Sequence, residues 1–317
     1  MERVPVTLNI EDYPESLRPL LDGAQVYDSR CHSGAEVLFI DRDDGYYLKS
    51  MKRGELETEA RMMKYFGELG LGAKVLHFEQ NERDYMLTAR VHGEDCTHST
   101  YLSDPRRLCE LYAELLYGLH QRDFAGCPVQ DRVGAYRTLA YENYRTGNYD
   151  KESFPDSFGY ASAEEAIAVI EKYGSSLKND TLIHGDFHTN NVFMQNGEPI
   201  LIDMDRVSRG HPIFELSDLH YFYVTLGEDD PAVVEKFMGF SYKTACRFFD
   251  LFLRRYLGTE DNERLQEVTE KASLLCYTRL IRKLRKKREP SEADRPIIDR
   301  CVKRIGELTA KLDTLAF

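Results

Sequence analysis

Three polar residues near the middle of the chain, Asp186, Asn191 and Asp203, have the types and spacing that phosphoryl transfer requires. Asp186 could accept the proton of an attacking hydroxyl, while Asn191 and Asp203 could hold a magnesium ion on nucleotide phosphates. Apolar runs flank these residues, with a turn at Asn196-Gly197 between them, so the sequence predicts a hairpin with acidic groups at its ends. A surface hairpin whose Asp and Asn side chains cap turns is the alternative, but turn chemistry does not demand a second acidic pair at this distance.

This stretch resembles the aminoglycoside phosphotransferase and choline kinase superfamily. His184-Gly185-Asp186 with Asn191 matches the kinase pattern H-R-D-x-x-x-x-N, with glycine in place of arginine. The segments Ile202-Asp203 and Gly210–Leu216 agree with the motifs that follow in the family. The N-terminal half is most similar to aminoglycoside 3'-phosphotransferases. The resemblance covers nearly the whole chain and implies a two-lobed, protein-kinase-like fold that transfers the γ-phosphate of ATP to a hydroxyl of a small molecule.

The expected fold class is therefore α+β, with an antiparallel sheet lobe over residues 1–91 and a larger helical lobe over residues 92–317. Alternating apolar residues predict about five strands in the first lobe, and an apolar stripe at helical spacing predicts one helix there. Beyond Gly93 the apolar period becomes helical. The clearest of the predicted elements in the first lobe are the strands Val37–Ile40, Tyr46–Lys49, Lys74–Phe78 and Asp84–Val91 and the helix Glu55–Phe66.

The resemblance also implies which residues bind the nucleotide. Lys49, at the end of a predicted strand, resembles the lysine that grips the phosphates, and Glu59 on the following helix resembles its ion-pair partner. Glu55 and Glu57 compete with Glu59 for this role.

Two further segments are expected to contact the nucleotide through backbone groups. Ser33 and Gly34 lie in the loop that would cover the phosphates. Thr88, Ala89 and Arg90 lie in the segment that resembles the family's hinge, where the adenine would bind. An ordinary hairpin turn and an inter-strand connection are the alternatives for these two segments.

Some roles stay open at this point. Glu215 occupies the position where the family usually has an aspartate that braces the catalytic loop, and Asp218 lies three residues further on. Asp205 could assist the metal or only cap the turn. His120, at the end of a predicted helix, has the position of a capping or packing residue.

Composition bounds the partners. The chain has 317 residues, 42% of them hydrophobic, and a net charge of −12, which is typical of a soluble globular protein and opposes polyanionic partners. Seven of the ten residues Arg279–Arg288 are basic, but without interleaved aromatic residues they indicate a solvated helix face rather than a nucleic-acid site. The N-terminus lacks a signal-peptide pattern, and the seven cysteines are scattered singly. We expect a cytoplasmic protein with no nucleic-acid, membrane or obligatory protein partner.

Three functions compete. The first is an aminoglycoside-type antibiotic kinase, and the second is a metabolic kinase of choline, a sugar, homoserine or a related alcohol. The third is a protein kinase or a nucleotide-binding protein without catalysis. ATP and Mg²⁺ are the expected cofactors, with GTP as an open alternative. If the acceptor is cationic, several carboxylates of the helical lobe could bind it; the candidates are Glu142, Asp150, Glu152, Asp156 and Asp218.

Overall fold

The chain divides into two compact units. We call the first the sheet unit, which comprises Met1–Asp95, Gly126–Pro128 and Asn191–Asp205, and the second the helical unit, which comprises the remainder. The predicted α+β class is confirmed. The computed structural model of the protein describes residues 4–29, 34–123, 126–128, 173–174, 177–178, 180–286 and 291–317.

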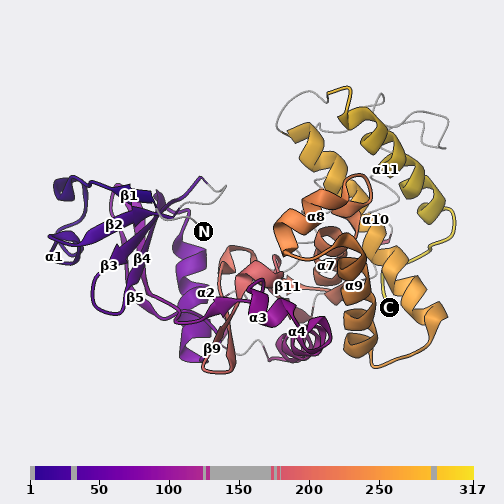
Figure 1. The fold of residues 1–317 in the computed structure, drawn as a ribbon, viewed down its shortest axis with the longest axis horizontal. Helices are drawn as coiled ribbons and strands as arrows, with labels where there is room; N and C mark the ends of the chain where they lie inside the picture. The colour runs from indigo at the N-terminus through magenta and orange to yellow at the C-terminus, as the bar shows by residue number, and fades with distance from the viewer. Residues whose placement is uncertain are drawn as a thin grey trace. The chain divides into compact units, whose positions relative to one another are not determined.

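A six-stranded sheet forms the centre of the sheet unit (Figure 1), with every strand antiparallel to its neighbours in the order β1-β2-β3-β4-β6-β5. The sequence predicted about five strands. The short edge strand β1 carries no readable alternation, because it has three residues and the side chain of Val4 is exposed. The strands are β1 (Val4–Val6), β2 (Gln25–Asp28), β3 (Glu36–Asp41), β4 (Tyr46–Lys52), β5 (Val75–Gln80) and β6 (Arg83–Ala89).

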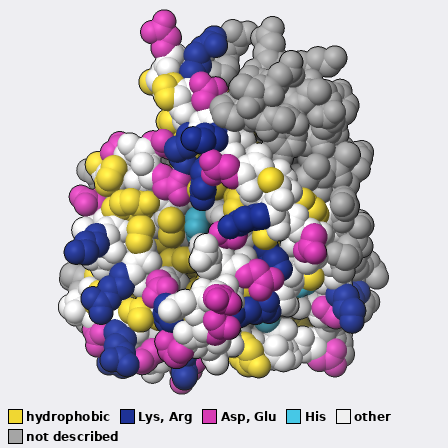
Figure 2. Space-filling view, turned by 90° about the vertical axis from the view of Figure 1, so that its right-hand side faces the viewer, with side chains coloured by type: hydrophobic (Ala, Val, Ile, Leu, Met, Phe, Trp, Pro, Cys, Tyr) yellow, Lys and Arg dark blue, Asp and Glu magenta, His cyan; other side chains and the backbone are white. Residues whose placement is uncertain are grey.

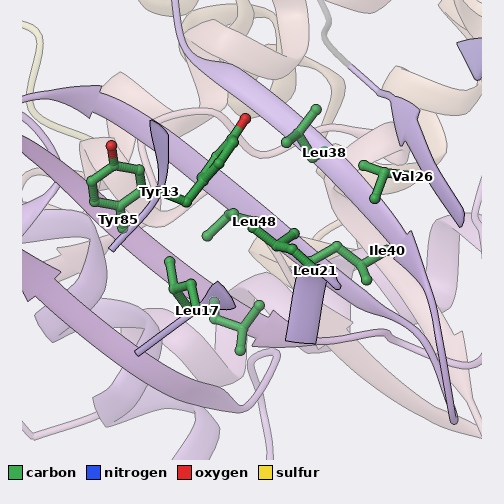
Figure 3. Packing of buried hydrophobic residues seen from close by; sticks show 9 residues of the cluster. Tyr13, Leu17, Leu21, Val26, Leu38, Ile40, Leu48 and Tyr85 are labelled. Atoms are coloured by element: carbon green, nitrogen blue, oxygen red, sulfur yellow. The ribbon is translucent and has the colours of Figure 1, made fainter. Parts of the chain in front are cut away.

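One face of this sheet carries a hydrophobic core (Figure 3). Leu38, Leu48 and Leu87 are direct cross-strand partners on β3, β4 and β6 and form a row across the sheet. The helix α1 (Arg18–Leu21) and the segment before it close over this row. Because successive strand residues point to opposite faces, this core also fixes which residues point away from it. The cluster consists of Tyr13, Leu17, Leu21, Val26, Leu38, Ile40, Leu48, Tyr85 and Leu87.

The helix α2 (Glu57–Glu68) confirms the predicted helix to within two residues at each end. Met62, Met63 and Phe66 are buried at helical spacing, as the apolar stripe predicted. The turn before the helix is held by Asp84 of β6, whose Oδ2 accepts the N–H groups of Gly54 (2.8 Å) and Leu56 (2.9 Å). The start of α2 is thereby tied to the sheet.

The predicted hairpin is also present in the sheet unit. The strands β9 (Val192–Gln195) and β10 (Glu198–Leu201) are antiparallel, and β7 (Glu94–Asp95) pairs with β9. Asn196 and Gly197, the two residues of the turn, have positive φ angles of 54° and 86°. Two left-handed residues match the twist of the strands, which explains the Asn-Gly pair.

The helical unit is organised around α7 (Pro212–Tyr223), which is buried on nearly all sides and lies among α8, α9 and α10 (Figure 1). Several of these helices begin with an aspartate or serine cap. In α8 the cap is Asp230, whose side chain accepts the N–H of Ala232, and Pro231 occupies the first helical position. The remaining elements of this unit are α3 (Ser99–Leu102), α4 (Pro105–His120), β8 (Thr181–Ile183), β11 (Ser208–Gly210), η6 (Thr225–Gly227), α8 (Pro231–Met238), α9 (Tyr242–Leu257), α10 (Asn262–Lys286) and α11 (Asp294–Thr309).

Charged side chains of both signs are scattered among hydrophobic and other groups over the described part of the face that Figure 2 turns to the viewer. Lys and Arg side chains lie between Asp and Glu side chains there, so the described part of this face has no large region of one sign. None of the helices in the described ranges is both long and apolar enough to cross a membrane.

We predict that Asp84→Ala destabilises the protein by roughly 3 kcal/mol, because two backbone N–H groups at the start of α2 lose their charged acceptor in a buried site. Asp84→Asn retains one acceptor oxygen and should have an intermediate effect. Denaturant unfolding measures both, with Asp41→Ala as the control because Asp41 is exposed on β3. An Asp84→Ala variant as stable as this control would show that the contact does not anchor α2.

Candidate active site

The strand β4 presents Lys49 on the sheet face opposite the Leu48 core, since the two residues are neighbours on one strand. The Nζ atom of Lys49 donates to both carboxylate oxygens of Glu59 on α2, at 2.9 and 2.8 Å. Glu55 and Glu57, the competing candidates, are exposed, whereas the Glu59 side chain is 5% exposed. The predicted partner of Lys49 is therefore the glutamate that contacts it.

This ion pair keeps the lysine charged. Burial lowers the pKa of Lys49, but the carboxylates of Glu59 and Asp203 more than offset it, and the net shift is upward. Burial raises the pKa of Glu59, and the Lys49 ammonium opposes that shift only in part. A cation held in place on a strand is suited to binding phosphate oxygens.

Asp203 lies beside this pair, with its Oδ1 atom 3.5 Å from Lys49 Nζ. The side chain of Asp203 is 44% exposed, so its carboxylate is accessible. Its φ angle is 61°, a left-handed conformation that is uncommon for a residue other than glycine and is often found at functional sites.

Asn191 is at the same end of the hairpin as Asp203. The backbone N–H of Ile202 donates to the carbonyl of Asn191 (3.1 Å), one step beyond the last ladder pair, Val192 and Leu201. A carboxylate and a carboxamide thus flank one end of the hairpin. Within the described residues, no group of three His, Cys, Asp or Glu side chains could hold a metal ion. This donor set fits magnesium, which usually takes one or two protein ligands and completes its shell with water and phosphate oxygens.

The other expected nucleotide contacts are partly described. Ser33 lies outside the described residues, and Gly34, which follows it, is exposed. In the hinge segment, the N–H of Ala89 donates to the carbonyl of Lys74 and that of Arg90 to the carbonyl of Gly45. These two amides are already used by the fold.

In the helical unit, the strands β8 and β11 form an antiparallel pair that leads into the predicted catalytic loop at His184. Gly185 has a φ angle of 83°, and a Cβ atom there would lie 2.7 Å from Cβ of Arg206. Glycine at this position lets the loop pass close to Arg206.

Glu215 braces this loop from the first turn of α7. Its Oε2 atom accepts the N–H of His184 (2.5 Å) and its Oε1 atom accepts the N–H of Gly185 (3.0 Å). The side chain is fully buried. The question that the sequence left open is answered by these contacts, because Asp218 makes neither of them.

His120 and Tyr256 lie behind the brace. The Tyr256 hydroxyl is 2.5 Å from His120 Nδ1, and His120 Nε2 is 3.8 Å from Glu215 Oε2. Burial and the nearby Glu215 carboxylate raise the pKa of Tyr256, so its hydroxyl keeps its proton and can donate it to Nδ1. His120 is buried at the end of α4 and packs against Tyr256, which agrees with the capping or packing residue that the sequence predicted.

Asp186 is surrounded by groups that are cationic or can become so. Its Oδ1 atom is 3.5 Å from Nη1 of Arg206 and 4.0 Å from Nη2 of Arg279, and its Oδ2 atom is 3.9 Å from Nε2 of His188. The sequence analysis singled out none of these three. Arg206 and His188 lie within the motif region and could have been noted there, but Arg279 is on α10 and no local signal links it to the loop.

One expectation about the acceptor must be corrected. Asp218 was a candidate for binding a cationic acceptor, but it is 1% exposed and contacts Nη1 of Arg279. Burial raises the pKa of the Asp218 carboxyl well above its usual range, even with the arginine in contact. The other four candidates, Glu142, Asp150, Glu152 and Asp156, lie outside the described residues.

The fold and the braced loop define a kinase-like phosphotransferase. Residues 30–268 match the model of the phosphotransferase enzyme family, APH, and the chain belongs to this family. It transfers a phosphoryl group to a hydroxyl of a small molecule, as the motifs predicted.

Individual relatives agree with this assignment. The chain is 38% identical over 191 residues to a "Probable aminoglycoside 3'-phosphotransferase" of Lactococcus lactis, covering 60% of this chain and 72% of the relative. A solved aminoglycoside-3'-phosphotransferase of type VIII is 22% identical, with a TM-score of 0.56 over 82% of this chain and 97% of that one. A thermostable mutant of aminoglycoside phosphotransferase APH(4)-Ia, solved with ADP and hygromycin B, has 13% identity and a TM-score of 0.60 over 93% and 96%. The two structures establish the likeness of fold.

We predict that Glu215→Gln lowers kcat by at least about tenfold, because the amide of glutamine cannot accept both loop N–H groups. Stability should fall as well, by about 1–3 kcal/mol, since one buried N–H loses its acceptor. Steady-state kinetics and thermal unfolding measure the two effects, and Glu235→Gln on the exposed face of α8 is the control. Unchanged kcat in Glu215→Gln would mean that the loop does not depend on the brace.

Proposed function

We propose that the protein transfers the γ-phosphate of ATP to a hydroxyl group of an aminoglycoside-like molecule. The relative from Lactococcus lactis supports this acceptor class by its name, and the fold neighbour solved with ADP and hygromycin B supports both the nucleotide and a hydroxyl-rich antibiotic. The observation that carries the proposal is the bidentate contact of Lys49 with Glu59 beside the Asp203 carboxylate, because it combines a fixed phosphate-binding cation with a metal ligand.

The residues of the sheet unit act on the nucleotide. Lys49 binds phosphate oxygens, and Glu59 holds the lysine in the required rotamer. Asn191 and Asp203 hold Mg²⁺, which neutralises charge on the phosphates when it is bound. The proposed contacts to the rest of the nucleotide come from backbone groups of two segments, but not from the amides of Ala89 and Arg90, which donate within the fold. The residues of the two segments are Ser33, Gly34, Thr88, Ala89 and Arg90.

Asp186 acts on the acceptor. Its carboxylate orients the attacking hydroxyl and takes its proton as the bond from that oxygen to the γ-phosphorus forms and the bond from the γ-phosphorus to ADP breaks. Glu215 keeps the loop in the conformation that this role requires, since it binds the two N–H groups before Asp186.

The test is a screen of the purified protein with ATP and Mg²⁺ against pooled aminoglycosides and pooled metabolic alcohols, followed by Asp186→Asn. We expect the variant to lose at least about a hundredfold in kcat, the scale of a lost general base, with near-normal nucleotide binding. The proposal of Asp186 as the base fails if the variant keeps near wild-type turnover. A parallel run with GTP determines the nucleotide preference.

A metabolic alcohol is the second candidate for the acceptor. The arginines that approach Asp186, Arg206 and Arg279, favour this alternative, because an ammonium group close to the reacting hydroxyl would be repelled by them. If the protein phosphorylates a neutral or anionic alcohol and no aminoglycoside, a metabolic alcohol replaces the aminoglycoside-like molecule as the proposed acceptor.

Asp203 and Asp205, the two carboxylates after the hairpin, should differ in their contribution to magnesium-dependent binding of ATP. Asp203→Ala should abolish magnesium-dependent binding of ATP, because it removes the only proposed carboxylate ligand, while Asp205→Ala should have a smaller effect. Calorimetry with ATP, in the presence and absence of Mg²⁺, measures both variants. Equal losses would show that the ranking of the two residues is wrong.

A further inference from the structure

Arg279 of α10 is held by three side chains of α7. Its Nη1 atom contacts the Asp218 carboxylate, and its guanidinium lies over the rings of Tyr221 and Phe222 at 4.6 and 5.2 Å from their centroids. Asp218, Tyr221 and Phe222 are three and four residues apart, so they share one face of the helix. A carboxylate and two aromatic rings therefore restrict the rotamer of this arginine.

The other edge of the same guanidinium faces the proposed catalytic base. Nη2 of Arg279 is 4.0 Å from Oδ1 of Asp186, and Nη1 of Arg206 approaches the same oxygen at 3.5 Å. The Arg279 side chain is 27% exposed, compared with 43% for Arg206, so solvent screens its charge less. His188, on the catalytic loop itself, faces Oδ2 at 3.9 Å.

We propose that Arg279 is a positioning residue for Asp186, and that the Asp218–Arg279 pair sets the orientation and charge state of this carboxylate. The inference rests on the proposed function, in which Asp186 is the base. The guanidinium acts by attraction: an opposite charge at this distance favours the ionised carboxylate and the rotamer that points toward it. Asp218, which is buried, acts only through Arg279.

A purely structural role makes a different prediction. In that case Arg279 would serve to neutralise the buried Asp218 carboxylate, and its loss would lower stability without changing the pH at which Asp186 becomes active. The two roles are separated by measuring kcat as a function of pH, in addition to stability.

The experiment compares Arg279→Gln, Arg279→Lys and the double variant Asp218→Asn with Arg279→Gln. Arg254→Gln is the matched control, because Arg254 is 23% exposed and pairs with Asp250 on its own helix, α9. For each variant we measure kcat across the acidic and neutral pH range, KM for ATP and for the acceptor, and thermal stability.

We expect Arg279→Gln to lower kcat by about tenfold and to move the acid limb of the kcat profile upward by about one pH unit, because a neighbouring cation no longer favours the ionised base. KM for ATP should stay within about twofold of wild type. Arg279→Lys should restore most of the acid limb, since it restores the charge, but less of kcat, since lysine lacks the planar fork. The double variant Asp218→Asn with Arg279→Gln should be more stable than Arg279→Gln alone, because it leaves no unpaired buried charge. The acid limb of its kcat profile should stay shifted.

Two outcomes would overturn the inference while the proposed function stands: a wild-type acid limb in Arg279→Gln, or recovery of both kcat and the acid limb in the double variant. Near wild-type turnover in Asp186→Asn would instead overturn the proposed role of the base, and the role of Arg279 with it. If Arg279→Gln alone does not fold, the double variant provides the same comparison of kcat and the acid limb.

Discussion

The buried carboxylate of Glu215 is the constraint on which the helical unit's chemistry depends. A fully buried negative charge is stable only where donors surround it, and here the donors are the backbone N–H groups of His184 and Gly185. The two residues of the loop that directly precede Asp186 are therefore fixed to the first turn of α7. The same helix presents Asp218, one turn further on, to Arg279, so a single buried helix contacts both the loop of the proposed base and the cation beside it.

In the sheet unit the equivalent constraint is the alternation of β4. Leu48 must face the core shared with Leu38 and Leu87, and this fixes the direction of Lys49. The ammonium group of Lys49 is held in one position only if a carboxylate contacts it on that face of the sheet. Asp84 ensures this by tying the start of α2 to the sheet, since Glu59 is in the first turn of that helix.

The sequence predicted those features whose determinants are local. The turn at Asn196-Gly197 and the helix α2 follow from turn chemistry and periodicity, and the family resemblance implied the contact between Lys49 and Glu59. The structure contains all three. The roles of these residues toward a nucleotide stay predictions. Arg279 could not be found in this way, because its approach to Asp186 depends on how α10 packs against α7. In the sequence it belongs to a basic run that is best explained as a solvated face.

Asp218 shows why net charge is a poor guide to the acceptor. A net charge of −12 suggested attraction of a cation, and Asp218 was one of the carboxylates available for it. In the folded chain this carboxylate is buried and contacts an arginine, and two guanidinium ions and the His188 ring approach the proposed base. Charges far apart on the surface are screened beyond a Debye length of about 10 Å at 0.1 M salt, whereas groups at contact distance are not. Among the described residues, Arg206 and Arg279 bring positive charge to Asp186. If Asp186 is the base, we expect a cationic acceptor to carry its ammonium groups away from the reacting hydroxyl.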